Sequence, residues 1–240
     1  FLFIREVVTQ PLHIAVESRQ FAPDTGIETN AFHCVKAAQR LLPVRKLAQQ
    51  AIECLDAGAT IVHAHTNQPK EDPNAAADVY IEAFKPVREK HPHGILYPTA
   101  NFDPAVYRKR RTPWRPEIQS GHYRKMAEAG AANMVLFDTG VVPIAVYDED
   151  GMLPKEGFWW YGFWPGDERI ALDVCNDLGT GASISVFEPG WMKNVIAMAR
   201  AGTLPRGAKV IMYFADYGWA GMPPPIPEDE RMITRKSKSK

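Results

Sequence analysis

The sequence predicts an α/β protein in which short apolar strands alternate with amphipathic helices along its 240 residues. Alternation of this kind is typical of a parallel sheet whose helices form right-handed crossovers. No G-x-G-x-x-G pattern follows the first predicted strand, which argues against a dinucleotide-binding sheet. We therefore predict a TIM-type (β/α) barrel, with about six of the usual eight β/α units present in this chain.

The predicted elements follow from hydrophobic periodicity and from the glycine and proline residues that bound it. Short apolar runs predict strands at 12–17, 59–65, 94–98, 133–137, 182–187 and 209–214. Apolar residues at helical spacing predict helices at 44–57, 75–89, 118–129, 167–177 and 191–201. Pro86 is expected to kink the second helix or end it early. Gly58, Gly130 and Gly202 are placed to end helices.

The predicted barrel domain covers residues 1–222 and is incomplete, because two β/α units are missing. Residues 223–240 are rich in proline and then in lysine and serine, without apolar periodicity, so this tail is predicted to be disordered. An open barrel would leave unpaired strand edges, and we expect a homo-oligomer to cover them. The 141–165 excursion carries an aromatic run that is either a lid or subunit contact, or an apolar cluster under a long loop.

Composition excludes several classes of partner. Lysine plus arginine and aspartate plus glutamate are equal at 28 each, so no net field attracts nucleic acid or an anionic membrane. No apolar run reaches membrane-spanning length. The three cysteines are few and widely spaced, which favours a reducing compartment such as the cytoplasm. The expected partner is therefore a small molecule.

Two histidines, His63 and His65, follow the apolar residues Ile61 and Val62 in the second predicted strand. Their i, i+2 spacing places both imidazoles on one face of a strand. The carboxyl end of a barrel strand is where such barrels keep their chemistry. Neutral imidazoles are good Zn²⁺ ligands, and a catalytic zinc takes about three protein ligands. The pair therefore indicates an incomplete metal site, and the alternative is two partly buried polar residues.

The wider sequence resembles the beta-keto acid cleavage enzyme family, whose type member is 3-keto-5-aminohexanoate cleavage enzyme. The resemblance rests on Gly58-Ala59 followed by the H-x-H strand, on a threonine after the fourth strand, and on the Phe187-Glu188-Pro189-Gly190 strand end. A hydrophobic strand leading to a glycine-containing loop completes it. It extends from about Pro11 to about Pro227.

This resemblance implies a zinc-dependent barrel that condenses a beta-keto acid with acetyl-CoA, giving acetoacetate and a new CoA thioester. It implies that His63 and His65 bind zinc, and that the metal holds the keto and carboxylate oxygens of the substrate. Thr139 matches a hydroxyl residue near the substrate, and Thr99 lies close to another. The alternative for both threonines is a hydrogen bond that only closes a strand end.

Other positions match the family less well. Glu17 ends the first predicted strand and could face the site, although its alignment is open. Glu188 either orients the barrel mouth or caps the following helix. Ser185 stands where the type member has a glutamate. Arg108 to Arg111 form a basic run that either contacts coenzyme A phosphates or is solvated.

The family's late R-V/C-G-L/F-E-D strand, which supplies the third zinc ligand and a catalytic Arg and Asp, has no counterpart in this sequence. Three hypotheses therefore stay open. The first is an enzyme of this family. The second is a non-catalytic truncated barrel or metal-binding remnant, and the third is a metal-dependent aldolase or hydrolase that uses the site differently.

Overall fold

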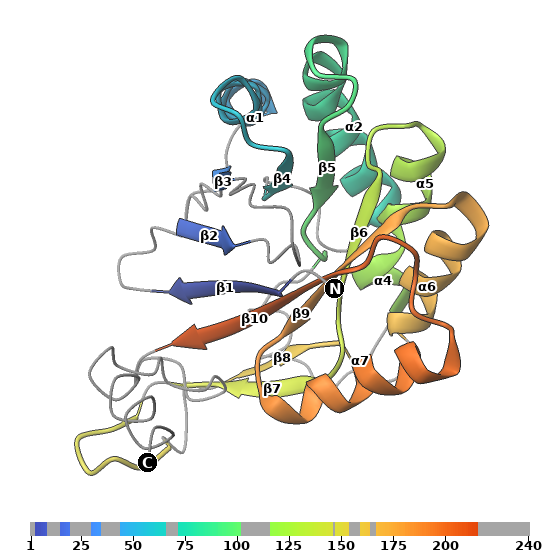
Figure 1. Ribbon diagram of the computed structural model, residues 1–240. Helices are drawn as coiled ribbons and strands as arrows, with labels where there is room; N and C mark the ends of the chain where they lie inside the picture. Colours follow the sequence, from blue (N-terminus) through green and yellow to red (C-terminus); the bar gives the residue numbers. More distant parts are fainter. Residues whose placement is uncertain are drawn as a thin grey trace, which may run out of the picture.

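The computed structural model is shown in Figure 1. It describes residues 3–8, 15–19, 30–34, 44–65, 72–101, 116–145, 147–153, 159–163 and 167–215. Two of the features predicted above lie outside these residues: the basic run Arg108 to Arg111 and the tail after residue 222. The backbone of Cys34 is described, but its side chain is not.

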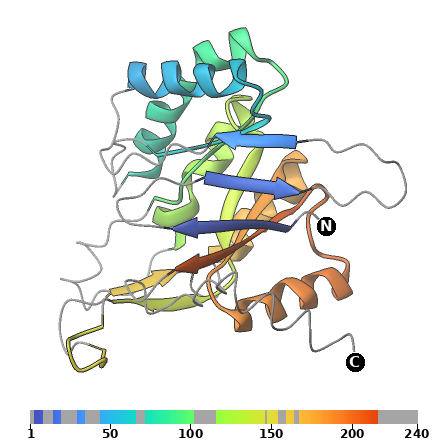
Figure 2. The same cartoon turned by 60° about the vertical axis from the view of Figure 1, so that its left-hand side comes forward.

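The described strands form three sheets. Their bounds are β1 Phe3–Val8, β2 Ala15–Arg19, β3 Asn30–Cys34, β4 Ile61–Ala64, β5 Ile95–Pro98, β6 Met134–Asp138, β7 Val141–Ile144, β8 Trp159–Gly162, β9 Gly181–Val186 and β10 Lys209–Ala215. The largest sheet has the order β3-β2-β1-β10-β9-β6, and the other two are β4-β5 and β7-β8. Figure 2 shows the blue strands β3, β2 and β1 as successive neighbours leading to the red-brown β10.

The predicted parallel pairing is confirmed for the strands that alternate with helices. Strands β10, β9 and β6 pair in parallel, and so do β4 and β5. Strand β1, which was not predicted, also pairs in parallel with β10. The β5 and β6 strands meet through the Asn133 backbone N–H, which donates to the Leu96 carbonyl at 3.2 Å. The arrangement is TIM-barrel-like, although the described strands form separate open sheets and no continuous ladder closes a barrel.

Two antiparallel pairings in the structure were not predicted from the sequence. The first predicted strand, 12–17, appears as β2 and runs antiparallel to β1, and β3 runs antiparallel to β2. Only six residues join β1 to β2, whereas a crossover between parallel strands needs a dozen or more, so the short connection imposes the antiparallel pair. The 141–165 excursion holds a second antiparallel pair, β7 and β8.

The described helices lie over the strands β4, β5, β6 and β9, whereas β1 to β3 have no described helix over them (Figure 1). The helices are α1 Val44–Asp56, α2 Pro73–Lys90, α4 Pro116–Ser120, α5 His122–Glu128, α6 Asp167–Leu178 and α7 Pro189–Ala201. The prediction that Pro86 ends its helix early is wrong, because α2 continues to Lys90. The single helix predicted at 118–129 is interrupted at Gly121, a residue that stabilises a helix interior poorly. No described helix combines the length and the apolar composition required to cross a membrane.

The buried residues divide β4 into two faces. Val62 and Ala64 pack in a cluster with the apolar faces of α1 and α2. Ile61 belongs to a second cluster, which contains Tyr97 of β5 and the core residues of β6 and β9. Because side chains alternate along a strand, His63 shares the face of Ile61, away from the covering helices. The fold therefore directs His63 toward the interior that the strands surround.

Candidate functional site

The two predicted metal ligands face each other at the carboxyl end of β4. Their Nε2 atoms are 2.9 Å apart, and the two rings meet edge to face with centroids 4.7 Å apart. His63 is partly buried, whereas His65 lies one residue beyond the strand and is exposed. The structure thus brings together the two nitrogens that the i, i+2 spacing predicted to share a face.

The spacing of these nitrogens suits a shared cation. Two imidazole nitrogens bound to one tetrahedral Zn²⁺, each about 2.0–2.1 Å from the metal, lie roughly 3.4 Å apart. A small opening of the pair from 2.9 Å would reach this separation. Among the described residues, no group of three or more His, Cys, Asp or Glu side chains converges as a metal site. The described part of the chain therefore brings together two candidate ligands and not a third.

The surroundings of His63 keep its imidazole neutral. Burial of the ring, followed by the positive charges of His65 and Lys209, lowers the pKa of His63 well below its ordinary value of 6.5. The backbone of Tyr97 opposes this shift in part. Because a metal binds the neutral imidazole, this environment favours the form that can act as a ligand.

Thr99 lies beside the histidine pair. Its backbone N–H donates to the carbonyl of Ala64, the residue between the two histidines, at 3.0 Å. The Tyr80 hydroxyl donates to the same carbonyl at 3.2 Å. The Thr99 carbonyl in turn is hydrogen-bonded to Nε2 of the buried His122 at 2.9 Å. These bonds tie the carboxyl ends of β4 and β5 together and place Thr99 next to the pair.

Thr139 follows β6 and has different surroundings. Its side chain is 7% exposed, and its hydroxyl donates to the Trp191 carbonyl at 3.1 Å. The Asn194 side-chain amide donates to the Thr139 carbonyl, so both polar groups of Thr139 connect to α7. These bonds agree with the alternative given for Thr139 above, in which its hydroxyl only closes the end of the strand. A role for Thr139 near a substrate stays a prediction.

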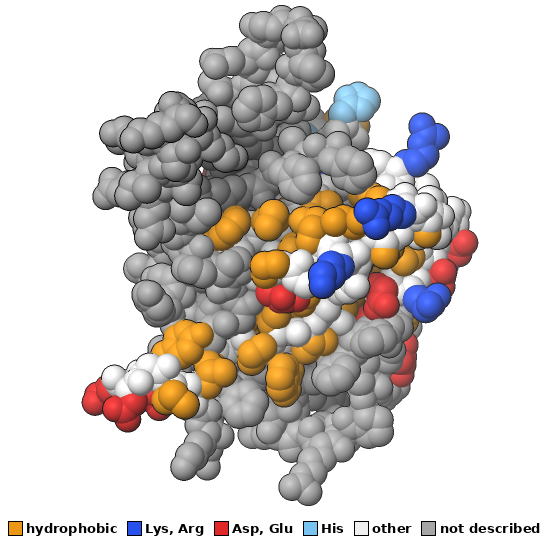
Figure 3. Space-filling view, turned by 60° about the horizontal axis from the view of Figure 1, so that its bottom comes forward, with side chains coloured by type: hydrophobic (Ala, Val, Ile, Leu, Met, Phe, Trp, Pro, Cys, Tyr) orange, Lys and Arg blue, Asp and Glu red, His pale blue; other side chains and the backbone are white. Residues whose placement is uncertain are grey.

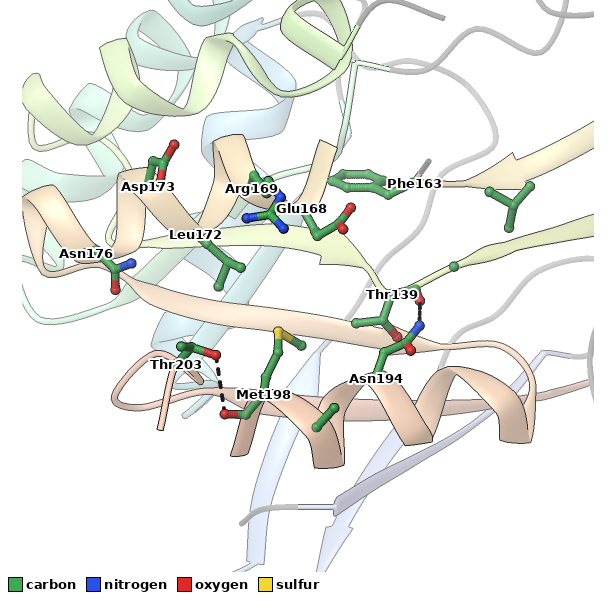
Figure 4. Close-up of a pocket in the computed structure, with 13 residues that line it drawn as sticks. Thr139, Phe163, Glu168, Arg169, Leu172, Asp173, Asn176, Asn194, Met198 and Thr203 are labelled. Atoms are coloured by element: carbon green, nitrogen blue, oxygen red, sulfur yellow. Dashed lines mark hydrogen bonds between the residues drawn. The ribbon is translucent and has the colours of Figure 1, made fainter. Parts of the chain in front are cut away.

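Thr139 also stands at one end of a groove of about 960 Å³ between α6 and α7. Figure 4 shows Thr139 and Asn194 at that end, with Asn176 of α6 and Thr203, which follows α7, at the other end. Neither His63 nor His65 is among the described residues that line this groove. The structure therefore places Thr99 with the histidine pair and directs Thr139 toward the helices.

A buried carboxyl at the end of β6 was not predicted from the sequence. Asp138 is 1% exposed and lies in register with Ser185 of β9. Burial raises the pKa of Asp138 to about 7, although hydrogen bonds with the hydroxyls of Ser185 and Tyr161 oppose the shift. Burial, together with the charge of Asp138, raises the pKa of Tyr161 well above 10. The one signal in the sequence that could have pointed to Asp138 is its position as a charged residue at the end of the apolar run 134–137.

Two glutamates remain among the predicted positions, Glu188 and Glu17. Glu188 is extended and its carboxylate accepts from the Gly190 N–H at 2.9 Å, with Pro189 following as the first helical residue. The cap interpretation of Glu188 is therefore confirmed. The backbone of Glu17 lies in β2, but its side chain is outside the described residues.

Parallel strands with external helices define a TIM-barrel-like α/β protein, in which two imidazoles converge at the carboxyl end of a strand. A sequence profile of the beta-keto acid cleavage enzyme family matches residues 34–236, most of the chain. The chain belongs to this family, as its sequence resemblance predicted. A search of curated protein sequences finds no match.

Two solved structures are similar in fold. The binary complex of ObcA with oxaloacetate superposes with a TM-score of 0.51 at 18% identity, covering 73% of this chain and 37% of that one. The ternary complex of ObcA with a C4-CoA adduct and oxalate superposes with a TM-score of 0.50 at 18% identity, covering 72% and 37%. The chain therefore spans a little over a third of the length of these structures.

Proposed function

We propose that this chain carries the zinc-binding part of an enzyme that condenses a beta-keto acid with acetyl-CoA, giving acetoacetate and a CoA thioester. The observation that carries the proposal is the convergence of His63 Nε2 and His65 Nε2 in a chain of this family. The ligands of ObcA support the substrate class, since oxaloacetate has a keto group β to a carboxylate and a CoA adduct is an acyl carrier.

The proposed roles follow from the contacts of each residue. His63 and His65 would hold the zinc through Nε2, and a bound zinc supplies Lewis-acid polarisation of the keto group. Thr99 is tied to the Ala64 carbonyl between them, so its hydroxyl is the proposed partner of a substrate oxygen. Thr139 and Glu17 are proposed as further substrate-facing residues on the resemblance alone. The sequence has only three cysteines and they are widely spaced, which supports a cytoplasmic location.

The metal part of the proposal is tested by zinc content. We expect the purified chain to retain zinc through gel filtration, and His63→Ala and His65→Ala to lose it. His93→Ala is the matched control, because His93 is exposed and lies outside the pair. Equal zinc content in all four proteins would refute the metal site.

The reaction is tested separately, by following the acetyl-CoA-dependent release of acetoacetate from a panel of beta-keto acids. We expect at least one acid to be consumed by the zinc-loaded chain and by His93→Ala, and not by His63→Ala. Zinc binding without consumption of any acid would instead support the metal-binding remnant. Consumption of an acid without acetoacetate formation would support the aldolase or hydrolase hypothesis.

We also propose that the chain self-associates through the β7–β8 hairpin. Of the six large hydrophobic side chains that are exposed among the described residues, four lie between β7 and the end of β8, namely Tyr147, Met152, Leu153 and Trp160. The hairpin lies at the lower left of Figure 1. At the lower left of Figure 3, hydrophobic (orange) and acidic (red) side chains lie together on the surface. Sedimentation should show an oligomer that Trp160→Glu weakens, and a monomer at all concentrations would contradict the proposal.

A further inference from the structure

A buried lysine lies in the interior that His63 faces. Lys209 is the first residue of β10 and is 5% exposed. Its backbone is in register with Ser183 of β9, and Ser183 is in register with Leu136 of β6, so these three side chains share one face of the sheet. From this position, Lys209 Nζ donates to the Tyr97 hydroxyl of β5 at 2.8 Å.

The contacts of this ammonium group are unusual for a buried charge. Besides the hydroxyl, Nζ lies 4.7 Å from the centroid of the Tyr97 ring, within range of a cation–π interaction. No carboxylate among the described residues forms an ion pair with it, whereas buried charges are usually paired. Replacing such a group by an apolar side chain of similar volume is often neutral or stabilising, so stability alone does not account for the lysine.

Tyr97 connects the lysine to the metal ligand. Tyr97 and His63 are register partners on β5 and β4. Their rings stack with centroids 4.5 Å apart and planes inclined by 25°. On its other side, His63 meets His65 through the two Nε2 atoms. One continuous set of contacts thus leads from Lys209 through the Tyr97 ring to the imidazole that faces the second histidine.

We propose that Lys209 and Tyr97 are positioning residues for the metal ligand His63. Lys209 holds the Tyr97 hydroxyl, and the fixed phenol ring supports one face of the imidazole, so that Nε2 is directed at the cation shared with His65. The proposal rests on the proposed zinc site. Residues that orient a metal ligand from outside the coordination sphere typically change metal affinity by about 10- to 100-fold when they are replaced.

The test is a zinc titration of the full chain in competition with a chromophoric chelator. We expect Tyr97→Phe and Lys209→Met each to weaken zinc binding by about tenfold, and Lys209→Arg to recover most of the loss, because arginine can still donate to the hydroxyl. Tyr147→Phe, on the exposed hairpin, is the matched control and should bind zinc as the natural chain does.

Thermal unfolding without zinc separates positioning from folding. A positioning role predicts that Tyr97→Phe and Lys209→Met unfold within a few degrees of the natural chain while zinc affinity falls. Unchanged zinc affinity in both variants, together with a loss in His63→Ala, would overturn the positioning role alone. Equal zinc affinity in the natural chain and His63→Ala would overturn the zinc site and, with it, this inference.

Discussion

Predicted site residues lie at the carboxyl ends of both β4 and β6, but their side chains have different surroundings in the fold. At the end of β4, the His63 and His65 nitrogens are directed at each other, with His65 exposed. At the end of β6, the Thr139 hydroxyl is directed into α7 and bonds the Trp191 carbonyl. One end directs its polar side chains at each other beside an exposed imidazole, and the other uses its polar groups to hold the strand to a helix.

The packing around the second end explains the difference. Gly140 follows Thr139, and its carbonyl accepts from the Phe163 N–H at 2.9 Å, which brings the β7–β8 hairpin over the strand end. A side chain on Gly140 would collide with the Trp191 indole. The end of β6 is therefore closed by the hairpin and α7. We expect substitutions there to change stability, and substitutions at the end of β4 to change zinc affinity.

A large loss of stability at every pH is expected from Gly162→Ala, at the close contact between the hairpin and the end of β6. Gly162 has a φ of +125°, and an added Cβ would overlap the Gly140 carbonyl oxygen. Backbone displacement of this kind should cost about 3 kcal/mol or more in the free energy of unfolding. Gly130→Ala is the control, since its φ is +66° with open space around it, and it should cost about 1 kcal/mol. Similar urea midpoints for the two variants would show that the end of β6 is not closed.

The second prediction is that the free energy of unfolding depends on pH because of Asp138. The pKa of its carboxyl is about 7 in the folded chain against 3.8 for an ordinary aspartate, so the folded state binds the proton more tightly. The natural chain should therefore lose stability as pH rises from about 4 to 7, by roughly 1.4 kcal/mol per pH unit and about 4 kcal/mol in all.

Asp138→Asn tests this dependence because the amide stays neutral and its oxygen can still accept from Ser185 and Tyr161. Relative to the natural chain, the variant should gain in free energy of unfolding between pH 4 and 7 and show no further change above pH 8. Urea unfolding at pH 5 and pH 8 measures the difference. Parallel stability curves for the two proteins would show that this carboxyl is not forced toward its neutral form.

Most elements after residue 44 could be predicted because their signals are local. The apolar stripe of α1 and the apolar run of β4 depend on residues close together in sequence, and both elements are confirmed. The Nε2 atoms of His63 and His65 also face each other, while their role as metal ligands stays a prediction. The antiparallel β2 and β3 could not be predicted in the same way, because strand direction depends on which distant strand offers a partner. Pairing of β1 with β10 joins residues about two hundred positions apart.

The support of the site also depends on distant contacts. Lys209 and Tyr97 are 112 residues apart in the sequence. Nothing in the local sequence around either residue indicates that their side chains will be in contact. The burial of Asp138 likewise depends on its register with Ser185 and on Tyr161 from an inserted hairpin. Sequence reasoning therefore located the histidine pair, and only the assembled strands show what surrounds it.

A smaller effect is expected from Thr139→Val, which removes the hydroxyl and keeps the shape. Loss of the buried bond to the Trp191 carbonyl should cost about 1 kcal/mol of unfolding free energy, with zinc affinity unchanged. Thr203→Val is the matched control, because its hydroxyl makes a longer, exposed bond of 3.4 Å to the Met198 carbonyl and should contribute less. Unchanged stability with weakened keto acid binding would instead make the end of β6 part of the substrate site.

The smallest effect on stability is expected from His65→Ala, at the open end of β4. His65 is exposed, so without zinc the free energy of unfolding should change by no more than about 0.5 kcal/mol. Zinc at about 100 times its dissociation constant should stabilise the natural chain by roughly 2.7 kcal/mol, because it binds the folded state, and should not stabilise the variant. Thermal unfolding with and without zinc measures both quantities, and His93→Ala should respond to zinc as the natural chain does. A large loss of stability in zinc-free His65→Ala would mean that the end of β4 is held together by its own imidazoles, in the same way that the end of β6 is held by Thr139.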